Sequence, residues 1–444
     1  MIAPVQTYPV PANSAAYQLK QCRQRSNGHE DPLRAVISWN SRVDQDAAQA
    51  DAEAAAGINR GPLHGHLIMI KDNIDTAGLR TTAGASFWSN RVPQQDAEVV
   101  RRLRASGIVI AAKTNMSEVA LGATNSNAAY GDCLNAWDTA RISGGSSGGS
   151  AAALAADYCQ LALGTDTGGS VRIPASLNGV LGLRPSFGRI STQGVVPLSP
   201  SQDVVGPMGR TAFHVATLTD ILTDGKAERS VAGQATARIG EPLTGMVVGV
   251  VQQFGSTHID SDIQSAVEAF AKQLGLLGAV IRDVGIEDWE AAAPIWSKIA
   301  PYEAAKIYTD RLQSSPDDFT PDVLRRLRQG AEITSAEYSS ALEDRAAFQA
   351  RMNARFVNFD VILTPTTPVT APRRDSSPEQ QAAVGALVHP WALHLGPTLS
   401  VPAGFDSAGM PVGVSLSARV GHEATLFQVA HAYEQLQLRD VRRP

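Results

Sequence analysis

Residues 141–185 read RISGGSSGGSAAALAADYCQLALGTDTGGSVRIPASLNGVLGLRP and contain nine of the 38 glycines of the 444-residue chain. One tenth of the chain therefore holds almost a quarter of its glycines. Two serine–glycine clusters, GGSSGGS and TDTGGS, flank an alanine-rich run and a short apolar run. Glycine is placed where a backbone turns sharply or approaches another group closely. Two such places beside hydroxyl side chains indicate a functional site.

The composition describes an ordinary globular protein with a large core, since 43% of its residues are hydrophobic and 18% are charged. The net charge of -5 provides no basic surface for nucleic acid or for an anionic membrane. No apolar run reaches the roughly 18–20 residues needed to cross a bilayer, and the N-terminus lacks the segments of a signal peptide. We therefore expect a soluble cytoplasmic protein with no nucleic-acid or membrane partner.

The three cysteines, Cys22, Cys133 and Cys159, are odd in number and widely spaced. They form neither a disulfide framework nor the paired spacing of a zinc site. This usage favours a reducing compartment, and it suggests no metal.

Strands and helices alternate along most of the chain. Gly65–Ile70 is an apolar run typical of a buried strand, and a helix and a second strand follow within 96–112, which predicts parallel pairing. The same alternation returns at 246–284, and a mostly helical block occupies 287–356. Because apolar strands return after every helical block, we expect one continuous sheet and a single domain over residues 1–444.

Two helix starts carry capping signals. Ser41–Asp44 resembles a capping box, and Thr334 with Glu337 forms a complete one. Within the helix that the second signal begins, three large apolar residues follow at a spacing of four, and we expect them to make core contacts: Phe348, Met352 and Phe356.

Lys71 directly follows the apolar run Gly65–Ile70. A charged amine at the end of a core strand is costly unless it is paired or has lost its proton. One interpretation is a lysine that extends past the sheet edge to water. The other is a buried amine whose pKa is lowered enough for it to act as a base.

The first serine–glycine cluster fits the GxSxG nucleophile elbow twice, through Ser146 and through Ser147. An elbow needs a hydrophobic strand directly before it, whereas residues 138–143, DTARIS, read as a loop. This context speaks against an α/β-hydrolase elbow. No lysine follows either cluster as a phosphate-binding P-loop requires, although a phosphate nest of another kind remains open.

The second cluster has a context that suits catalysis. A strand at 161–163 leads into the turn 164–169, and Ser170 opens a helix-like stretch. The N–H groups from Thr167 to Ser170 would point into the hollow of the turn and stabilise an oxyanion while the serine attacks a carbonyl. The alternative is a serine that merely caps a helix. None of the nine histidines lies in a sequence context that indicates a catalytic base. Lys71 is therefore the candidate base, and Ser146 the candidate proton relay.

These residues resemble the amidase signature family. The run GGSSGGSAAALAA followed by LGTDTGGSVRIPASLNGVLGLRPSFGRIS is similar to its signature, and IMIKDNIDTAGLRTTAG is similar to the segment that carries its catalytic lysine. LSVPAGFDSAGMPVGVSLSA resembles its closing strands. The resemblance runs from Gly61 to the C-terminus and is strongest over 61–209.

The resemblance implies a role for each matching residue. Ser170 would be the acyl-forming nucleophile, Lys71 the base, and Ser146 the bridging serine with a cis peptide bond before it. No metal or cofactor would take part. The implied fold is one α/β domain whose large, twisted, mixed sheet is covered by helices on both faces. The oxyanion hole would use N–H groups of Thr167, Gly168 and Gly169 together with Ser170, and the supporting hydrogen bonds would come from Ser147, Asp166 and Arg172.

The resemblance also predicts a function, a hydrolase that cleaves a small or aryl amide through an acyl-enzyme on Ser170. A carbamate (urethanase) or ester hydrolase is the nearest alternative, and a glutamine amidotransferase A-type subunit and a non-catalytic binding subunit are further alternatives. Glutamine amidotransferase subunits of the family usually carry a tyrosine and an aspartate before the last strands, whereas residues 382–400 read AAVGALVHPWALHLGPTLS. This difference favours a free-standing enzyme, which the family often builds as a homodimer, acting on a small amide or carbamate. Within and around the mostly helical block 287–356, the pocket is expected to be lined by the loops around Met116–Tyr130, the helical stretch 287–330 and the segment His389–Leu395. Four aromatic residues are candidates for this lining: Trp296, Tyr302, Phe319 and Trp391.

Overall fold

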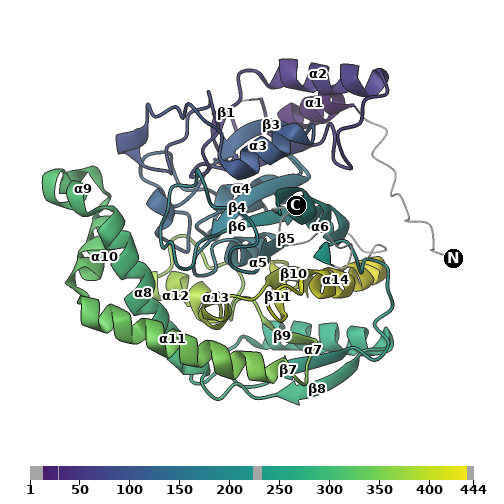
Figure 1. Ribbon diagram of the computed structural model, residues 1–444, viewed down its shortest axis with the longest axis vertical. Coiled ribbons are helices and arrows are strands. Elements are labelled where there is room, and N and C mark those ends of the chain that lie inside the picture. The colour runs from purple at the N-terminus through teal and green to yellow at the C-terminus, as the bar shows by residue number, and fades with distance from the viewer. Residues whose placement is uncertain (1–13, 29, 224–232, 438–444) are drawn as a thin grey trace.

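A computed structural model describes residues 14–28, 30–223 and 233–437. The sequence also predicts an irregular N-terminal arm at 1–13 and a surface segment at 224–242. The arm and residues 224–232 of the surface segment lie outside the described residues. The described strands form one 11-stranded sheet in a single large α/β domain (Figure 1). The expected single domain with one mixed sheet is confirmed.

The sheet combines parallel and antiparallel pairs. β2 pairs in parallel with β3 and β4, and β7 pairs in parallel with β8 and β9, while the strands between these two groups pair antiparallel. The strands, in their order across the sheet, are β1 (Val36–Trp39), β3 (Val109–Thr114), β2 (Leu67–Lys71), β4 (Leu161–Asp166), β6 (Val204–Gly209), β5 (Leu181–Arg184), β10 (Thr398–Phe405), β11 (Pro411–Ser417), β9 (Val361–Pro365), β7 (Val247–Val251) and β8 (Val280–Val284).

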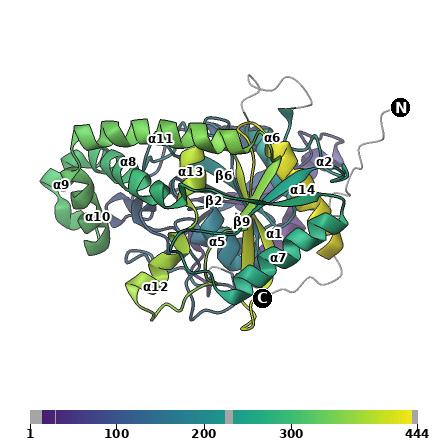
Figure 2. The same ribbon diagram turned by 90° about the horizontal axis from the view of Figure 1, so that it is seen from below.

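Helices cover both faces of the sheet. Figure 2, which looks from below, shows the strands as a twisted fan between two groups of helices. One face packs against α3 (Glu98–Ala105), α6 (Ala212–Leu222), α7 (Ser261–Leu276) and α14 (Glu423–Gln437). The other face packs against α1 (Ala15–Arg25), α2 (Val43–Ala55), α4 (Gly148–Ala155), α5 (Arg172–Asn178) and α13 (His389–His394).

The alternation of side chains along β2 explains why both faces are covered. Leu67 and Met69 belong to the core on the α4 side, whereas Ile68 and Ile70 belong to the core on the α3 side. Successive residues of a strand point to opposite faces, so an uninterrupted apolar run needs a helix layer on each side. The next residue, Lys71, therefore returns to the α4 side, where the first serine–glycine cluster lies.

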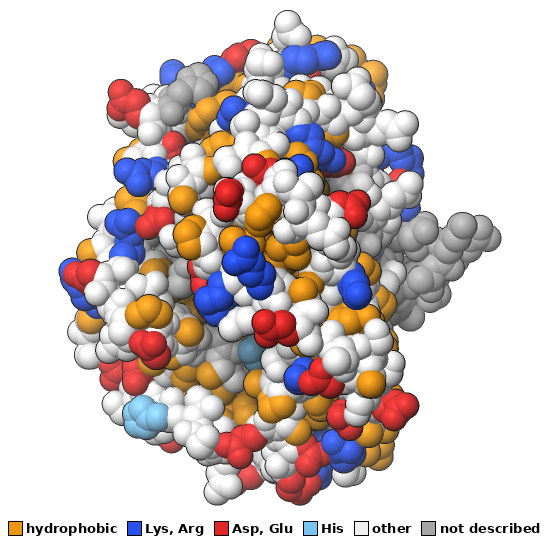
Figure 3. Space-filling model, turned by 90° about the vertical axis from the view of Figure 1, so that its left-hand side faces the viewer, with side chains coloured by type: hydrophobic (Ala, Val, Ile, Leu, Met, Phe, Trp, Pro, Cys, Tyr) orange, Lys and Arg blue, Asp and Glu red, His pale blue; other side chains and the backbone are white. Residues whose placement is uncertain are grey.

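The helical block forms an arm at one end of the sheet (Figure 1). On the molecular face that includes this arm, acidic and basic side chains are interspersed, with no large area of a single charge (Figure 3). None of the described helices is long and apolar enough to cross a membrane. The arm consists of α8 (Ala292–Ile307), α9 (Thr309–Ser314), α10 (Pro321–Glu332) and α11 (Ser335–Arg355), and the short helix α12 (Pro378–Ala382) follows β9.

One of the two capping predictions is confirmed and the other is wrong. The Thr334 hydroxyl accepts from the Glu337 N–H at 3.2 Å, and the Glu337 carboxylate accepts from the Thr334 N–H at 2.9 Å. At α2 the residue before the helix is Arg42, and its N–H donates to the side-chain oxygen of Asn40 at 2.9 Å. The asparagine side chain thus replaces the serine cap expected at Ser41. The expected core residues Phe348, Met352 and Phe356 are all buried.

Candidate active site

Lys71 lies at the end of β2 with its whole side chain buried. Its ammonium nitrogen donates to Ser146 Oγ at 2.7 Å, to Thr165 Oγ1 at 2.8 Å and to the Thr165 carbonyl at 3.3 Å. The lysine therefore does not extend to water, and the edge interpretation is excluded. A core strand, the first serine–glycine cluster and the end of β4 meet at this one nitrogen.

Burial lowers the pKa of Lys71 from 10.5 to about 7, and the attraction of the Asp166 and Asp203 carboxylates only partly opposes this effect. Near neutral pH a large fraction of the amine is therefore unprotonated and able to accept a proton. A second fully buried lysine, Lys113, has a pKa lowered to about 8 by burial, but its amine donates to the Ile74 carbonyl and to two threonine hydroxyls rather than to a serine. Lys71 alone of the two contacts a candidate relay.

The backbone of the first serine–glycine cluster is closely packed against neighbouring segments of the core. The Gly145–Ser146 peptide bond is cis, as the family resemblance implies. A Cβ on Gly149 would lie 2.4 Å from the Asn115 nitrogen and the Ala35 carbonyl oxygen, so only glycine fits there. The Ser147 N–H donates to the Ser170 carbonyl at 3.1 Å, which holds the two serine–glycine clusters side by side.

The structure answers the two alternatives that the first serine–glycine cluster left open. The residues before it, 138–143, form a loop with isolated bridges, so neither serine sits on a strand-to-helix elbow. The N–H groups of Gly145, Ser147, Gly148 and Gly149 donate to protein oxygens. With these donors used, the cluster does not form a phosphate nest.

The turn before Ser170 presents backbone donors. Thr167 is fixed through its hydroxyl, which donates to Asp203 at 2.6 Å, and Gly169 through its N–H, which donates to Asp166 at 2.8 Å. Among the described residues, the N–H groups of Thr167, Gly168 and Ser170 have no hydrogen-bond acceptor. Of the three N–H groups named for an oxyanion hole, that of Gly169 is therefore engaged by a carboxylate, whereas those of Thr167 and Gly168 are available.

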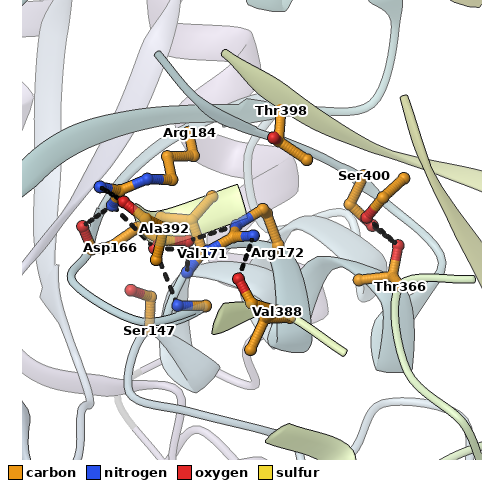
Figure 4. A network of polar contacts seen from close by, with 12 residues as sticks. Ser147, Asp166, Val171, Arg172, Arg184, Thr366, Val388, Ala392, Thr398 and Ser400 are labelled. Carbon is orange, nitrogen blue, oxygen red and sulfur yellow. Dashed lines mark hydrogen bonds and ion pairs between the residues drawn. The ribbon is translucent and has the colours of Figure 1, made fainter. Parts of the chain in front are cut away.

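Asp166 lies between two arginines beneath this turn (Figure 4). It accepts from Arg172 at 3.0 and 3.1 Å and from Arg184 at 3.1 Å, and all three side chains are fully buried. Burial alone would raise the pKa of Asp166, but the two guanidinium groups outweigh it and hold the pKa well below its usual range. The carboxylate is thus ionised, and it fixes the N–H groups of Gly169 and of Val171 on either side of Ser170.

Asp166→Asn should destabilise the fold. The substitution leaves two buried guanidinium groups without a counter-charge, which costs about 3–5 kcal/mol of unfolding free energy. Urea denaturation measures this loss. The matched control is Asp375→Asn, which breaks an exposed pair with Arg373 and should leave the urea midpoint almost unchanged. Equal stability of the two variants would contradict the central role of Asp166.

Two residues of the site went unnamed in the sequence reasoning. Thr165 accepts from Lys71 and from the Asn73 amide, and Asp203 binds Thr167. Burial raises the pKa of Asp203 to about 6. Thr165 directly precedes the aspartate of TDTGGS and was visible as a hydroxyl in the cluster, but Asp203 lies in a later segment with no local signal.

The four aromatic candidates divide between core and site. Trp391 and Phe319 are buried in the core, and Tyr302 stacks on Tyr338 with ring centroids 4.3 Å apart. Trp296 instead contacts the turn at Gly168. No group of three or more His, Cys, Asp or Glu side chains within the described ranges is arranged to hold a metal ion.

Comparison with known proteins gives consistent matches over nearly the whole chain. A family model described as Amidase matches residues 19–427. The A-type subunit of glutamyl-tRNA(Gln) amidotransferase from a Synechococcus strain is 34% identical over 453 residues, covering 94% of this chain and 93% of that protein. The protein of the same name from Ralstonia nicotianae is 36% identical, covering 93% of each chain. A solved structure described as "Crystal structure of amidase" superposes with a TM-score of 0.86 at 32% identity, covering 96% of each chain.

These relatives overturn one prediction. The sequence favoured a free-standing hydrolase of a small or aryl amide, and that prediction is wrong because the curated relatives with this coverage are named amidotransferase subunits. The prediction relied on the missing tyrosine and aspartate in residues 382–400. Similarity along the whole chain outweighs the absence of two side chains in one segment.

Proposed function

Because the chain belongs to the amidase family, whose enzymes cleave the C–N bond of amides, we propose that it is the amide-cleaving subunit of a glutamine-dependent amidotransferase. The observation that carries the proposal is the buried Lys71 amine at 2.7 Å from Ser146 Oγ, beside the turn that ends in Ser170. Its similarity to the amidotransferase subunits supports glutamine as the amide donor. In this proposal a partner protein carries out the transfer of nitrogen.

The proposed reaction begins when Ser170 Oγ attacks the side-chain carbonyl carbon of glutamine. The hydroxyl proton passes to Ser146, whose own proton passes to the neutral Lys71 amine. The C–N bond then breaks, and the proton returns from Lys71 through Ser146 to the departing nitrogen, which leaves as ammonia. A glutamyl ester remains on Ser170. Water attacks this ester by the same relay and releases glutamate.

The negative charge that develops on the carbonyl oxygen needs donors fixed in advance. Thr167, Gly168 and Ser170 supply N–H groups that no described acceptor uses, so we assign the oxyanion hole to them. Gly169, also predicted as a donor, acts in this proposal by holding the turn through Asp166, and the Thr167 hydroxyl holds it through Asp203. Ser147, Asp166 and Arg172 support the turn from beneath.

Ammonia release from glutamine tests the proposal. The purified chain should release ammonia from glutamine faster than from benzamide or acetamide at the same concentration, and glutamine should protect Ser170 from a fluorophosphonate probe. Protection is measured by mass spectrometry of the labelled peptide, and it needs no partner protein. If benzamide is the better substrate and glutamine gives no protection, the chain is not a glutamine-dependent subunit.

A further inference from the structure

Two side chains from distant parts of the chain, Trp296 and Val388, cover the turn 167–170. A Cβ on Gly168 would lie 2.6 Å from Trp296 Cζ2 and 2.9 Å from Trp296 Nε1, so the indole of α8 rests directly on this glycine. A Cβ on Gly169 would lie 2.6 Å from Val388 Cγ2. The Arg172 guanidinium donates to the Val388 carbonyl at 3.0 Å, which ties the start of α13 to the same turn.

His389 follows Val388 and completes this cover. Its ring faces that of Trp296, with centroids 4.5 Å apart and an angle of 33° between the planes. Burial and the nearby Arg172 guanidinium lower the pKa of His389 to about 4, so the imidazole is neutral at physiological pH. The molecular face that carries the helical arm has a hollow (Figure 3).

The pair holds two buried polar atoms that find no hydrogen-bond partner among the described residues, Trp296 Nε1 and His389 Nδ1. A buried donor without an acceptor costs about 1–3 kcal/mol, and such atoms call for an explanation. Trp289 and Trp391 also have unpartnered Nε1 atoms, but these two indoles pack edge to face against each other in the core. Trp296 differs because it contacts the backbone that precedes Ser170.

The chemistry of these two atoms is complementary. An indole N–H is a donor only, whereas the unprotonated nitrogen of a neutral imidazole is an acceptor. A carboxamide offers the matching groups, a carbonyl oxygen that accepts and an N–H that donates. An ester has the oxygen but not the N–H. With the indole on Gly168 and the imidazole stacked on the indole, the two ring nitrogens thus fit an amide head group better than an ester.

We propose that Trp296 and His389 bind the carboxamide that Ser170 attacks, Trp296 Nε1–H donating to the carbonyl oxygen and His389 Nδ1 accepting from the amide N–H. Trp296 is then an oxyanion donor beyond the backbone groups, and His389 sets the preference for amides over esters. The proposal rests on Ser170 attacking a carboxamide, as proposed above, but does not require that the carboxamide belong to glutamine.

The test compares glutamine with the γ-methyl ester of glutamate, which differ only in the group that leaves. His389→Phe should lower kcat/KM for glutamine about tenfold or more while leaving the ester within about twofold, since one lost hydrogen bond is worth about 1–2 kcal/mol. His389→Asn, which keeps an acceptor, should restore part of the amide rate. Trp296→Phe should lower kcat for both substrates about a hundredfold, the usual effect of losing one oxyanion donor.

Matched controls lie on α13 itself. His394→Phe and Trp391→Phe remove a buried imidazole and an unpartnered indole N–H away from the turn, and they should leave the amide-to-ester ratio unchanged. The rate of fluorophosphonate labelling reports the reactivity of Ser170 and should stay unchanged in His389→Phe. If His389→Phe does not fold, His389→Asn and Trp296→Phe carry the test.

The proposal is overturned if the His389 variants lower amide and ester rates equally, or if Trp296→Phe has no more effect than Trp391→Phe. Failure of the proposed function gives a different result, because the wild type then releases no ammonia from glutamine. In that case propionamide and methyl propionate replace the glutamine pair, and the same ratio tests the two side chains.

Discussion

Ser170→Ala should abolish ammonia release from glutamine, with kcat falling about a million-fold, as when the serine of such a relay is removed from other hydrolases. The loss has this size because no other group forms the acyl bond. Alanine also has no hydroxyl proton for Ser146 and Lys71 to remove. The fold should stay intact, since Ser170 is held through its backbone carbonyl, which accepts from the Ser147 N–H. Initial rates of ammonia release and the unfolding midpoint measure both effects.

The matched control is Ser176→Ala, six residues further along α5. Ser176 is buried and its hydroxyl lies 3.4 Å from that of Thr367, so its removal affects packing without touching the relay. This variant should retain activity within a fewfold wherever it is folded. Substantial glutamine hydrolysis by folded Ser170→Ala protein would remove Ser170 as the nucleophile.

The order of elements was predictable from the sequence because the apolar runs were long and bounded. The run before Lys71 and the strands of the alternating segment 246–284 were predictable because helices cover both faces of the sheet, so such strands read as nearly continuous apolar sequence. β5 and β6 escaped notice. They contain glycines and lie next to the turn, where the backbone meets Val171 at close range and strand periodicity is lost.

The site was predictable in part for a similar reason. Lys71, Ser146 and Ser170 each stand beside a local signal, either a strand end or a glycine cluster. His389 and Trp296 were named as pocket candidates, but nothing in the sequence brings them to the turn, because their position depends on how their segments pack against Gly168 and Gly169. Asp203 likewise reaches Thr167 only through the antiparallel pairing of β4 and β6. Contacts made by tertiary packing between distant segments leave no spacing in the sequence to detect.

Lys71→Met should remove activity and at the same time change how stability depends on pH. Loss of the general base lowers kcat about a hundred- to ten-thousandfold. In the wild type, kcat/KM should fall about tenfold per pH unit below pH 7, because burial sets the pKa of Lys71 to about 7 and only the neutral amine accepts a proton. The residual kcat/KM of the variant should not show this decline below pH 7.

The stability effect follows from the same pKa. The lysine titrates at about 7 in the folded protein and at 10.5 in the unfolded chain, so between these values the unfolded chain binds more protons. Unfolding free energy should therefore rise with pH across this window, by about 1.4 kcal/mol per unit from this group. Below pH 7 the lysine is charged in both states, so its destabilising effect has its full value and no longer changes with pH. Lys71→Met lacks this term, so its stability relative to the wild type should be greatest at pH 7 and decline toward pH 10.

Urea denaturation at pH 7, 8, 9 and 10 measures this difference, which isolates Lys71 because every other group titrates in both proteins. Lys113→Met provides the comparison. Lys113 is equally buried with a pKa of about 8, so its variant should show the same trend over a narrower window while the acidic limb of kcat/KM stays near pH 7. A relay base must be kept neutral, and the burial that does so lowers the stability of the fold. If Lys71→Met shows no pH-dependent gain in unfolding free energy over the wild type, the amine is charged in the folded protein and is not a base.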